Sequence, residues 1–568
     1  MTTFTTPAPP TSRETSLAQR GTLLGAAAIF LLTFACHLPL LGNPPLAGTE
    51  GLRVIPAHDM VRTGDWILIR LYGALYLIKP PLHDWLIAIS EIVSRSGGNE
   101  FVWRLPSVIG AAFLNASLYL FGARWFGRLG GIVSGICGLG LIALWGQART
   151  ADVDGTNTLA CTLTVLCLIE LHFGSPARRW PWIWGGGLAF GATLMTKGPA
   201  GLPIIVGELL WLVISSGRLD GRRGVRGAFG SPATWGPLLI GVSLFGAYAF
   251  AAWRAVHHLN TMPDFSGLQE VNKTLYPNTI ARFAGALLVP FLAFGFALPV
   301  SLALPLALIP GFRNAIAASG NEETPRVRLT DALAASVLLS WFVCLLSGMV
   351  NVRYAYVTYC PLCLLAGALA ASVPYLAESL ANIFRAIVAG SIVVLAGGYW
   401  FIALGLAWKG GIGHPAMLAA GAAGTLIAAI SFRRVTTRLS WTPAWALAIL
   451  LAVTAVPFAY QFRVERNYHS GKEAAHELLD TVGPKAAVIS GSVLRSHPEM
   501  FFYAGLNAQA TMTFHLQNPS RYSGNCWVVL DYPYEYAIWT KAAPNRLSRW
   551  SRIKCGKDVC YVAWLAGK

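Results

Sequence analysis

Ionisable side chains are concentrated in one long loop that follows the first apolar stretch of the chain. The loop covers residues 42–104 and contains the string LAGTEGLRVIPAHDMVRTGDW. Its ionisable residues include Glu50, Arg53, His58, Asp59, Arg62, Asp65, Arg70 and Lys79. Loops that only connect two helices are short, and ionisable groups next to apolar spans are usually functional. The loop is therefore predicted to form part of an active site at a membrane surface.

Four further polar groups are expected on the same side of the membrane. They are the Arg–Asp turn with Arg149, Asp152 and Asp154, the TKGP turn with Lys197, the loop 254–282, and the segment VNVRYAY with Arg353 and Tyr354. Arg and Lys hold phosphate through charge-assisted hydrogen bonds. A carboxylate can deprotonate an incoming hydroxyl or stabilise positive charge on a sugar carbon. The combination suits a phosphate ester whose lipid tail lies in the bilayer.

Several of these residues also have a purely structural interpretation. Lys79 precedes two prolines and could extend its ammonium to the interface from the start of a helix. Glu50 could cap or solvate its loop. Asp154 could cap the helix that follows it, and that role is compatible with a function in catalysis.

Other polar residues have equally open interpretations. Arg149 could form a structural bridge to Asp152, and Lys197 could anchor phospholipid headgroups instead of substrate. His257 and His258 do not have the spacing of metal ligands on their own, so no metal ligand is predicted from them.

The composition places most of the chain in a membrane. The 568 residues are 55% hydrophobic and 12% charged, and their mean hydropathy is +0.53, whereas a soluble domain carries about 25% charged residues. The formal net charge of +17 comes from basic residues in short loops between apolar runs. Such loops are typical of cytoplasmic segments that face anionic lipid. The pattern indicates membrane lipids as partners and argues against nucleic acid.

Residues 21–462 are predicted to form the transmembrane domain. Its apolar stretches, about thirteen by the twenty-residue criterion, are 22–41, 105–123, 130–147, 155–173, 183–196, 199–216, 235–253, 283–309, 331–350, 355–374, 386–407, 414–431 and 441–461. Arg residues occupy alternate connections, which the positive-inside rule assigns to the cytoplasm. The tail 1–20 is then cytoplasmic, the C-terminus lies outside, and the protein is a multi-pass protein of the inner (plasma) membrane. Segments 52–63 and 80–93 are expected to be helices that lie at the interface.

The sequence changes character near Arg463, and residues 463–568 are predicted to form an extracytoplasmic α/β domain. Helices are expected at 471–481 and 497–504, strands at 486–491 and 526–531, and a hairpin at 550–564. Cys555 and Cys560 could pair across this hairpin, with Cys526 as an alternative partner, or the three could remain thiols.

Several strings of the sequence resemble a known enzyme family. GDWILIRLYGALYLIKPPLHDWLIA, LMTKGPAGL and RYAYVTYCPL are similar to segments of the polyprenyl-phosphate-dependent glycosyltransferases of the GT-C fold. The nearest branches are the bacterial lipid A aminoarabinose transferases and the protein O-mannosyltransferases. The resemblance covers most of roughly the first two thirds of the chain. It implies transfer of a sugar from a polyprenyl-phosphate donor to an extracytoplasmic acceptor, which would be a lipid A-like glycolipid or a protein hydroxyl.

The resemblance also implies roles for individual residues. Lys79 and Tyr76 would contact the donor phosphate, and Asp154 would match the carboxylate of the Arg–Asp turn. Together with the residue pattern, this predicts two catalytic residues, Glu50 and Asp154. The predicted substrate-binding residues are Lys79, Tyr76, Arg353, Tyr354, Lys197 and Arg149.

Two positions depart from the family pattern. The family usually has Asp-Glu where this chain has Thr49-Glu50, and it often has Glu before Lys-Pro-Pro, where this chain has Ile78. The second position is a metal ligand in some relatives, so its replacement argues against a divalent cation, and no cofactor is predicted. The missing Asp leaves Glu50 or Asp154 as the candidate base, and an anionic acceptor such as a phosphate would need no strong base.

Two other functions fit part of the pattern. A transporter or flippase for a polyprenyl-linked lipid would also span the membrane many times, but such proteins commonly show repeats and charges near the bilayer midplane, which this sequence lacks. The replacements at Thr49 and Ile78 are also compatible with a non-catalytic relative. The sequence does not identify the sugar or the acceptor.

Overall fold

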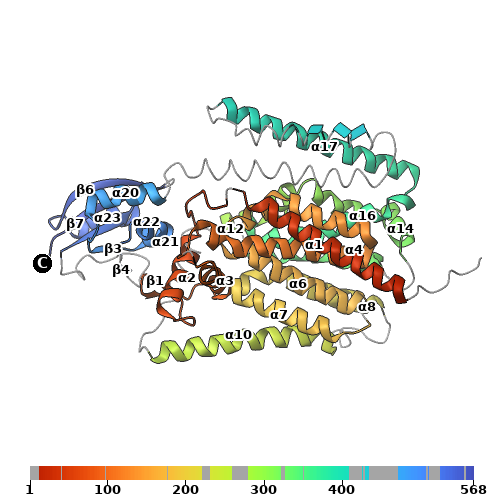
Figure 1. Cartoon of the computed structure of the whole chain (residues 1–568), viewed down its shortest axis with the longest axis horizontal. Helices are drawn as coiled ribbons and strands as arrows, with labels where there is room; N and C mark the ends of the chain where they lie inside the picture. Colours follow the sequence, from red (N-terminus) through yellow and green to blue (C-terminus); the bar gives the residue numbers. More distant parts are fainter. Residues whose placement is uncertain are drawn as a thin grey trace, which may run out of the picture.

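The computed structural model describes most of the chain. The described residues are 12–39, 41–95, 97–174, 177–219, 230–258, 279–320, 326–348, 351–408, 422, 425–426, 429–430, 432–433, 471–506, 509–510, 525–555 and 558–567. They form a bundle of long helices, a loop region at one end of the bundle, and a domain with a β-sheet beyond that loop (Figure 1). Within this part of the chain, 6 helices are long and apolar enough to cross a membrane, or 7 if one bent pair counts as a span. The protein is therefore a polytopic α-helical membrane protein.

The N-terminal part of the bundle is a helix packed on a helical hairpin. Helix α1 (Ser12–His37) packs along α4 (Glu100–Gly140). Helix α4 consists of two helices that fold at Gly127, where φ is 85° and ψ is 174°. A Cβ atom added at Gly122 would lie 2.9 Å from the Cα atom of Gly131, so these small residues allow the two halves to touch. The halves correspond to the predicted spans 105–123 and 130–147.

The middle of the bundle consists of five further helical segments and one short 3-10 turn. They are α5 (Ile142–Ala148), α6 (Val153–Phe173), α7 (Trp180–Lys197), η1 (Gly198–Gly201), α8 (Pro203–Leu219) and α10 (Pro232–His258). Helix α6 packs against α4, α7 and α8, and α10 packs against α7. Much of the buried apolar core lies between α4, α6, α8 and the later helix α16 (Tyr359–Ser372).

The last described helices of the bundle include a broken span. They are α12 (Thr279–Phe296), η2 (Val300–Leu302), α13 (Ala303–Leu308), α14 (Pro310–Ala318), α15 (Arg326–Leu346), η3 (Val352–Thr358), α16 (Tyr359–Ser372), η4 (Val373–Tyr375) and α17 (Glu378–Trp408). The predicted span 283–309 bends by 106° at its break, where Pro299 lacks the N–H that a continuous helix needs. Of the remaining predictions, the span 441–461, most of 414–431 and most of the loop 254–282 lie outside the described residues.

The long first loop is itself folded. It contains α2 (Gly51–Thr63), the two-residue strands β1 (Arg70–Leu71) and β2 (Ala74–Leu75), and α3 (Leu82–Ser94). Helices were predicted at 52–63 and 80–93, and α2 and α3 confirm both. Helix α3 starts after Pro80-Pro81 because proline suits the first turn of a helix and cannot continue one from before. The loop has its own apolar core, which includes Val54, Ile69 and Ile87.

The C-terminal domain is built on a five-stranded sheet of order β4-β3-β5-β7-β6. Its strands are β3 (Val488–Ser490), β4 (Gln509–Ala510), β5 (Cys526–Asp531), β6 (Leu547–Cys555) and β7 (Asp558–Leu565). Its helices are α20 (Gly471–Val482), α21 (Ser492–Ser496), α22 (Pro498–Tyr503) and α23 (Tyr534–Ala542). Strand β3 is parallel to β4 and β5, whereas β7 is antiparallel to both of its neighbours.

The three cysteines of this domain are thiols, on two faces of the sheet. Cys555 and Cys560 lie in the apolar core on one face, and Cys526 lies in the core on the other. The alternative pairing through Cys526 was therefore wrong. In the β6–β7 register Cys555 is opposite Asp558, and Cys560 is opposite Ile553. The two thiols are thus diagonal neighbours, and diagonal residues are farther apart than a disulfide normally spans.

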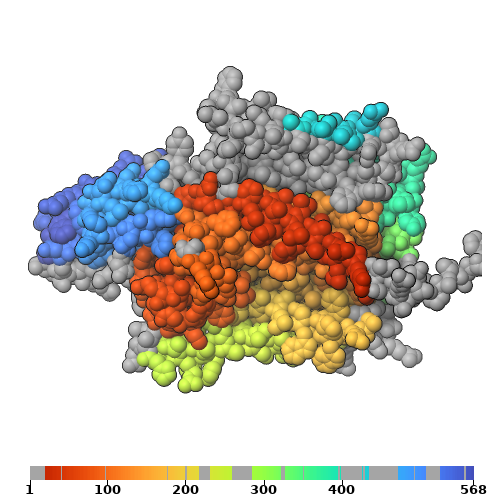
Figure 2. Space-filling view, viewed as in Figure 1, coloured from red at the N-terminus to blue at the C-terminus, as the bar shows by residue number. Residues whose placement is uncertain are grey.

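The C-terminal domain docks on the first loop (Figure 2). The Tyr503 hydroxyl accepts a hydrogen bond from the Leu46 N–H at 2.7 Å and donates to Glu100 Oε1 at 2.9 Å. The Tyr72 hydroxyl of the loop donates to the carbonyl of Pro498 at 2.7 Å. Residues separated by more than 400 positions in the sequence are therefore joined at one end of the bundle.

Candidate active site

The turn between α5 and α6 brings two carboxylates to the end of the bundle that carries the first loop. Asp152 caps α6, since its Oδ1 atom accepts a hydrogen bond from the Val153 N–H at 2.7 Å. The hydroxyl of Thr49 donates to the other oxygen of Asp152. Asp154 lies in the first turn of α6, where the helix dipole favours negative charge. The side chain of Asp154 is only 7% exposed.

Two basic residues from other elements pair with these carboxylates. Lys197, the last residue of α7, forms a buried ion pair with Asp154, and its Nζ atom lies 4.8 Å from the centroid of the Tyr354 ring. Arg353 of η3 places Nη1 3.5 Å from Asp152 Oδ2 and 3.4 Å from Asp154 Oδ2. The Arg353 side chain is 45% exposed, so its guanidinium is accessible to a ligand. Four of the predicted residues, Asp154, Lys197, Arg353 and Tyr354, are thus brought together.

Lys79 belongs to the same electrostatic cluster but has a different environment. Burial, together with the positive charges of Lys197 and Arg53, lowers the pKa of Lys79 to about 8, and the charges of Asp152 and Asp154 oppose this shift. No carboxylate of the described residues forms an ion pair with its ammonium. A partly buried ammonium without a fixed counter-ion favours an anionic ligand, because the ligand would relieve the repulsion between the cations.

The lowered pKa of Lys79 predicts the pH dependence of anion binding. Below about 8 the ammonium is charged and would attract an anionic ligand. As the pH rises through this value the free protein loses the charge, so the affinity for such a ligand should fall up to about tenfold per pH unit. Lys79→Arg should move this decline to higher pH, because a guanidinium stays protonated. Binding of a polyprenyl phosphate, the ligand that the resemblance implies, to the purified protein across the alkaline range checks this. An identical decline in both proteins would assign the titration to another group.

Tyr76 supports this cluster from inside the loop. It is 5% exposed, and the guanidinium of Arg53 lies 5.3 Å from its ring centroid. Arg53 also forms a buried pair with Asp84 of α3, at 3.3 Å. Burial raises the pKa of Asp84 to about 7, although the charge of Arg53 opposes this rise. The structure therefore places Tyr76 in the core of the loop, where its direct contact is Arg53.

His83 links the first loop to α6. Its Nδ1 atom lies 2.9 Å from the Thr156 hydroxyl. Burial and the charge of Arg53 lower the pKa of His83 to about 3, so its imidazole is neutral. Its Nε2 atom is buried and has no hydrogen-bond partner among the described residues. The contact fixes α3, and with it Lys79, against the helix that carries Asp154.

Glu50 lies beside this cluster, but its carboxylate is already fully used. Its Oε1 atom accepts from Arg104 Nε at 2.9 Å and from the Ala151 N–H at 2.8 Å. Its Oε2 atom accepts from Arg104 Nη2 at 3.0 Å and from the Ala47 N–H at 3.1 Å. A carboxylate has about four acceptor sites, and Glu50 is only 2% exposed. These contacts do not fit the expected role as catalytic base: Glu50 instead holds the turn that precedes Asp152.

Arg149 also stabilises the conformation of this turn. It donates from Nη1 to the carbonyl of His37 at 2.5 Å and from Nη2 to the carbonyl of Pro39 at 2.8 Å. Its side chain is buried. These contacts tie the turn to the end of α1, so they support a structural role for Arg149 and not the expected contact with substrate.

The sequence pattern did not reveal several residues that position the cluster. Arg53, His83, Asp84 and Arg104 were not predicted as site residues, and Asp152 was expected only as a member of the Arg–Asp turn and as a partner for Arg149. Arg104 is the second basic residue after the loop helices and lies at the start of an apolar helix. A basic residue there signals an interface, and nothing local indicates its partner Glu50.

Comparison with known proteins points to the same family that the sequence strings described above resemble. The family described as dolichyl-phosphate-mannose-protein mannosyltransferase matches residues 78–223. This segment includes Lys79, the Arg–Asp turn and Lys197.

Curated relatives are named for a sugar transferase. The undecaprenyl phosphate-alpha-4-amino-4-deoxy-L-arabinose arabinosyl transferase 2 of Pseudomonas fluorescens is 28% identical over 204 residues, which are 34% of this chain and 35% of that protein. The corresponding transferase of Aeromonas salmonicida is 27% identical over 292 residues, which are 50% of this chain and 49% of that protein. The chain thus matches between about a third and a half of the length of these relatives.

A solved structure extends the likeness over the whole chain. ArnT from Cupriavidus metallidurans in the apo state matches with a TM-score of 0.63 and 16% sequence identity, covering 97% of this chain and 100% of that one. This chain has the GT-C fold. The ArnT structure bound to undecaprenyl phosphate matches with a TM-score of 0.61 and covers 96% of this chain. The resemblance to GT-C polyprenyl-phosphate glycosyltransferases is therefore confirmed.

Proposed function

We propose that this protein is an integral membrane glycosyltransferase that moves a sugar from a polyprenyl-phosphate donor to an extracytoplasmic acceptor. The observation that carries the proposal is the cluster of Lys79, Lys197 and Arg353 around Asp152 and Asp154. Cations and carboxylates of this kind suit a reaction in which a phosphate leaves and a hydroxyl attacks. The names of the arabinosyl transferase relatives support the same reaction class.

Two cations are the best placed to hold the donor phosphate. Arg353 is half-exposed and pairs with the carboxylates at 3.4 and 3.5 Å, which are loose contacts for a guanidinium. Lys79 has no fixed counter-ion among the described residues. Lys197 is buried, forms an ion pair with Asp154 and contacts the ring of Tyr354. It would therefore stabilise the site and not bind the donor.

The transfer itself would be a single displacement at the anomeric carbon. The acceptor oxygen forms a bond to this carbon while the bond to the phosphate oxygen breaks, and the electron pair leaves with the polyprenyl phosphate. The configuration of the sugar is inverted. A hydroxyl acceptor releases its proton to Asp154, with Asp152 beside it, whereas an ionised phosphate acceptor releases none. Lys197 pairs with Asp154, while Lys79 and Arg353 stabilise the charge on the leaving phosphate.

The proposal includes a membrane topology. About thirteen spans, a cytoplasmic tail 1–20 and an extracytoplasmic domain 463–568 follow from the distribution of Arg residues. The start of α6, the end of α7 and η3 then lie together at the outer face, beside the first loop. We place the protein in the inner (plasma) membrane. The acceptor is a lipid A-like glycolipid or a protein hydroxyl.

A transfer assay in detergent tests the function. Purified protein is mixed with labelled undecaprenyl-phosphate sugar and either lipid A or an acceptor protein, without vesicles. Labelled product is expected with the wild type, and Asp154→Asn should lower the rate by about 100-fold or more, because loss of a general base costs 10²–10⁴. Asp59→Asn, a matched change at a partly buried carboxylate of α2 that pairs with Arg62, should have the wild-type rate.

The same assay separates the rival functions. A flippase forms no labelled product in detergent, and neither does a non-catalytic relative. If Asp154→Asn transferred sugar to a hydroxyl acceptor as fast as Asp59→Asn, the carboxylate would have no part in the reaction.

A further inference from the structure

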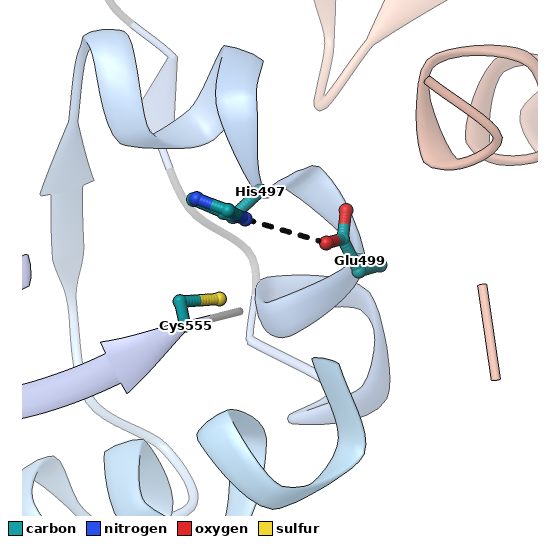
Figure 3. Close-up of side chains that lie close together, drawn as sticks. All are labelled: His497, Glu499 and Cys555. Carbon is teal, nitrogen blue, oxygen red and sulfur yellow. Dashed lines mark ion pairs between the residues drawn. The ribbon is translucent and has the colours of Figure 1, made fainter. Parts of the chain in front are cut away.

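Three metal-ligating side chains converge inside the C-terminal domain, away from the cluster described above. His497 lies between α21 and α22, Glu499 lies in α22, and Cys555 ends strand β6 (Figure 3). One ligand atom from each residue lies within 4.8 Å of the other two. We propose that these three side chains bind a transition-metal ion, and that zinc is the ion that fits them.

The types of ligand select the ion. Imidazole, thiolate and carboxylate are the ligands of zinc sites, with bonds of about 2.0–2.3 Å. Magnesium and calcium prefer oxygen ligands alone, so a thiolate argues against both. The Nδ1 atom of His497 lies 3.5 Å from Glu499 Oε1. Two ligands that share a tetrahedral ion at such bond lengths are roughly 3.3 Å apart, so this pair needs little movement.

The other nitrogen of His497 has a partner that would orient the ring. Its Nε2 atom lies 3.0 Å from Asp558 Oδ2. Metal-binding histidines usually donate their second N–H to a carboxylate or carbonyl, which fixes the ring and its tautomer. Asp558 is directly opposite Cys555 in the β6–β7 register. One hairpin therefore supplies both a ligand and the group that turns Nδ1 towards it.

The cluster is buried and has an unsatisfied acceptor. Glu499 and Cys555 are 3% and 1% exposed, and Glu499 Oε2 is buried without a hydrogen-bond partner among the described residues. A buried carboxylate oxygen without a partner favours a nearby cation, and a divalent metal ion supplies one.

The position of the cluster indicates a structural role for the ion. Glu499 follows Pro498, which accepts the hydrogen bond from Tyr72 of the first loop. A Cβ atom added at Gly51, the first residue of α2, would lie 3.2 Å from the Glu499 backbone nitrogen. The ion would join the β6–β7 hairpin to α22, the helix that docks on the loop. This role does not depend on the proposed transferase function.

Zinc binding by the full-length protein tests the proposal. Untagged protein in detergent is stripped with a chelator, incubated with zinc, desalted, and its metal content measured. We expect one zinc per chain in the wild type and in Cys526→Ser, whose thiol lies on the opposite face of the sheet. Cys555→Ser and His497→Gln should lose stoichiometric zinc. Cobalt should give a sulfur-to-metal charge-transfer band in the wild type and in Cys560→Ser but not in Cys555→Ser.

Thermal unfolding shows whether each variant is folded. Zinc should raise the unfolding midpoint of the wild type and of Cys560→Ser by several degrees, since ligands that bind only the native state stabilise it, and it should leave Cys555→Ser unchanged. The proposal is overturned if the wild type retains no zinc after desalting, or if Cys555→Ser keeps both the zinc and the charge-transfer band. In either case the cluster would be an imidazolium–carboxylate pair alone.

Discussion

Replacement of Lys79 by alanine should lower the rate of sugar transfer by about 100-fold or more while the protein stays folded. A charge-assisted hydrogen bond to phosphate is worth about 1.5–3 kcal/mol, and each 1.36 kcal/mol corresponds to a factor of ten in rate. The ammonium also offsets the charge that develops on the leaving phosphate. Since Lys79 pairs with no carboxylate of the described residues, its removal leaves no buried charge behind, so the fold should persist.

The control for this variant is the same substitution at another lysine. Lys485→Ala removes the same charge from an exposed position of the C-terminal domain and should transfer sugar at the wild-type rate. Lys79→Arg should keep part of the activity, because it retains the charge but not the shape. Full activity in Lys79→Ala, with an unchanged unfolding midpoint, would remove Lys79 from the site.

Replacement of Arg104 by alanine should destabilise the protein by about 3–5 kcal/mol. Arg104 is 0% exposed and forms a bidentate pair with Glu50. It also donates to the carbonyls of Leu41, Pro44 and Pro45, at 2.8, 2.7 and 3.0 Å. The substitution would leave a buried carboxylate and three backbone carbonyls, two of them in buried hydrogen bonds, without this donor. The unfolding midpoint in detergent measures the loss.

Two further variants separate packing from chemistry at this pair. Arg62→Ala removes a 70% exposed guanidinium and should change stability by less than about 0.5 kcal/mol. Glu50→Gln should lower the unfolding midpoint less than Arg104→Ala, yet transfer sugar below that midpoint, because the carboxylate holds the turn and does not take a proton. Equal midpoints for Arg104→Ala and Arg62→Ala would refute the structural role. Loss of transfer by folded Glu50→Gln would restore the catalytic one.

The sequence predicted those residues of the cluster that lie at the ends of membrane helices. Asp154 begins one helix, Lys197 ends the next, and Arg353 precedes another, so the alternation of spans alone puts all three at the same end of the bundle. The sequence also predicted the loop helices α2 and α3, as well as most strands of the C-terminal sheet. Element type follows from local pattern.

The sequence could not predict contacts that the tertiary fold alone creates. Glu50 and Arg104 are 54 positions apart, and neither position differs in type from a solvated loop residue. A carboxylate with four donors and a free one look the same in a sequence. His497 and Cys555 are likewise brought together only by the β6–β7 hairpin, and the spacing of two cysteines suggested a disulfide there.

The position of Arg353 between two carboxylates has a consequence for the order of events in the proposed reaction. A phosphate that recruits this guanidinium must draw it away from Asp152 and Asp154, which leaves carboxylate oxygens open to a hydrogen bond from the acceptor hydroxyl. Binding of the lipid donor would therefore make the proposed base, Asp154, available to the acceptor hydroxyl. An enzyme without donor would keep both carboxylates paired with Arg353 and would leave other hydroxyl groups, including water, unactivated.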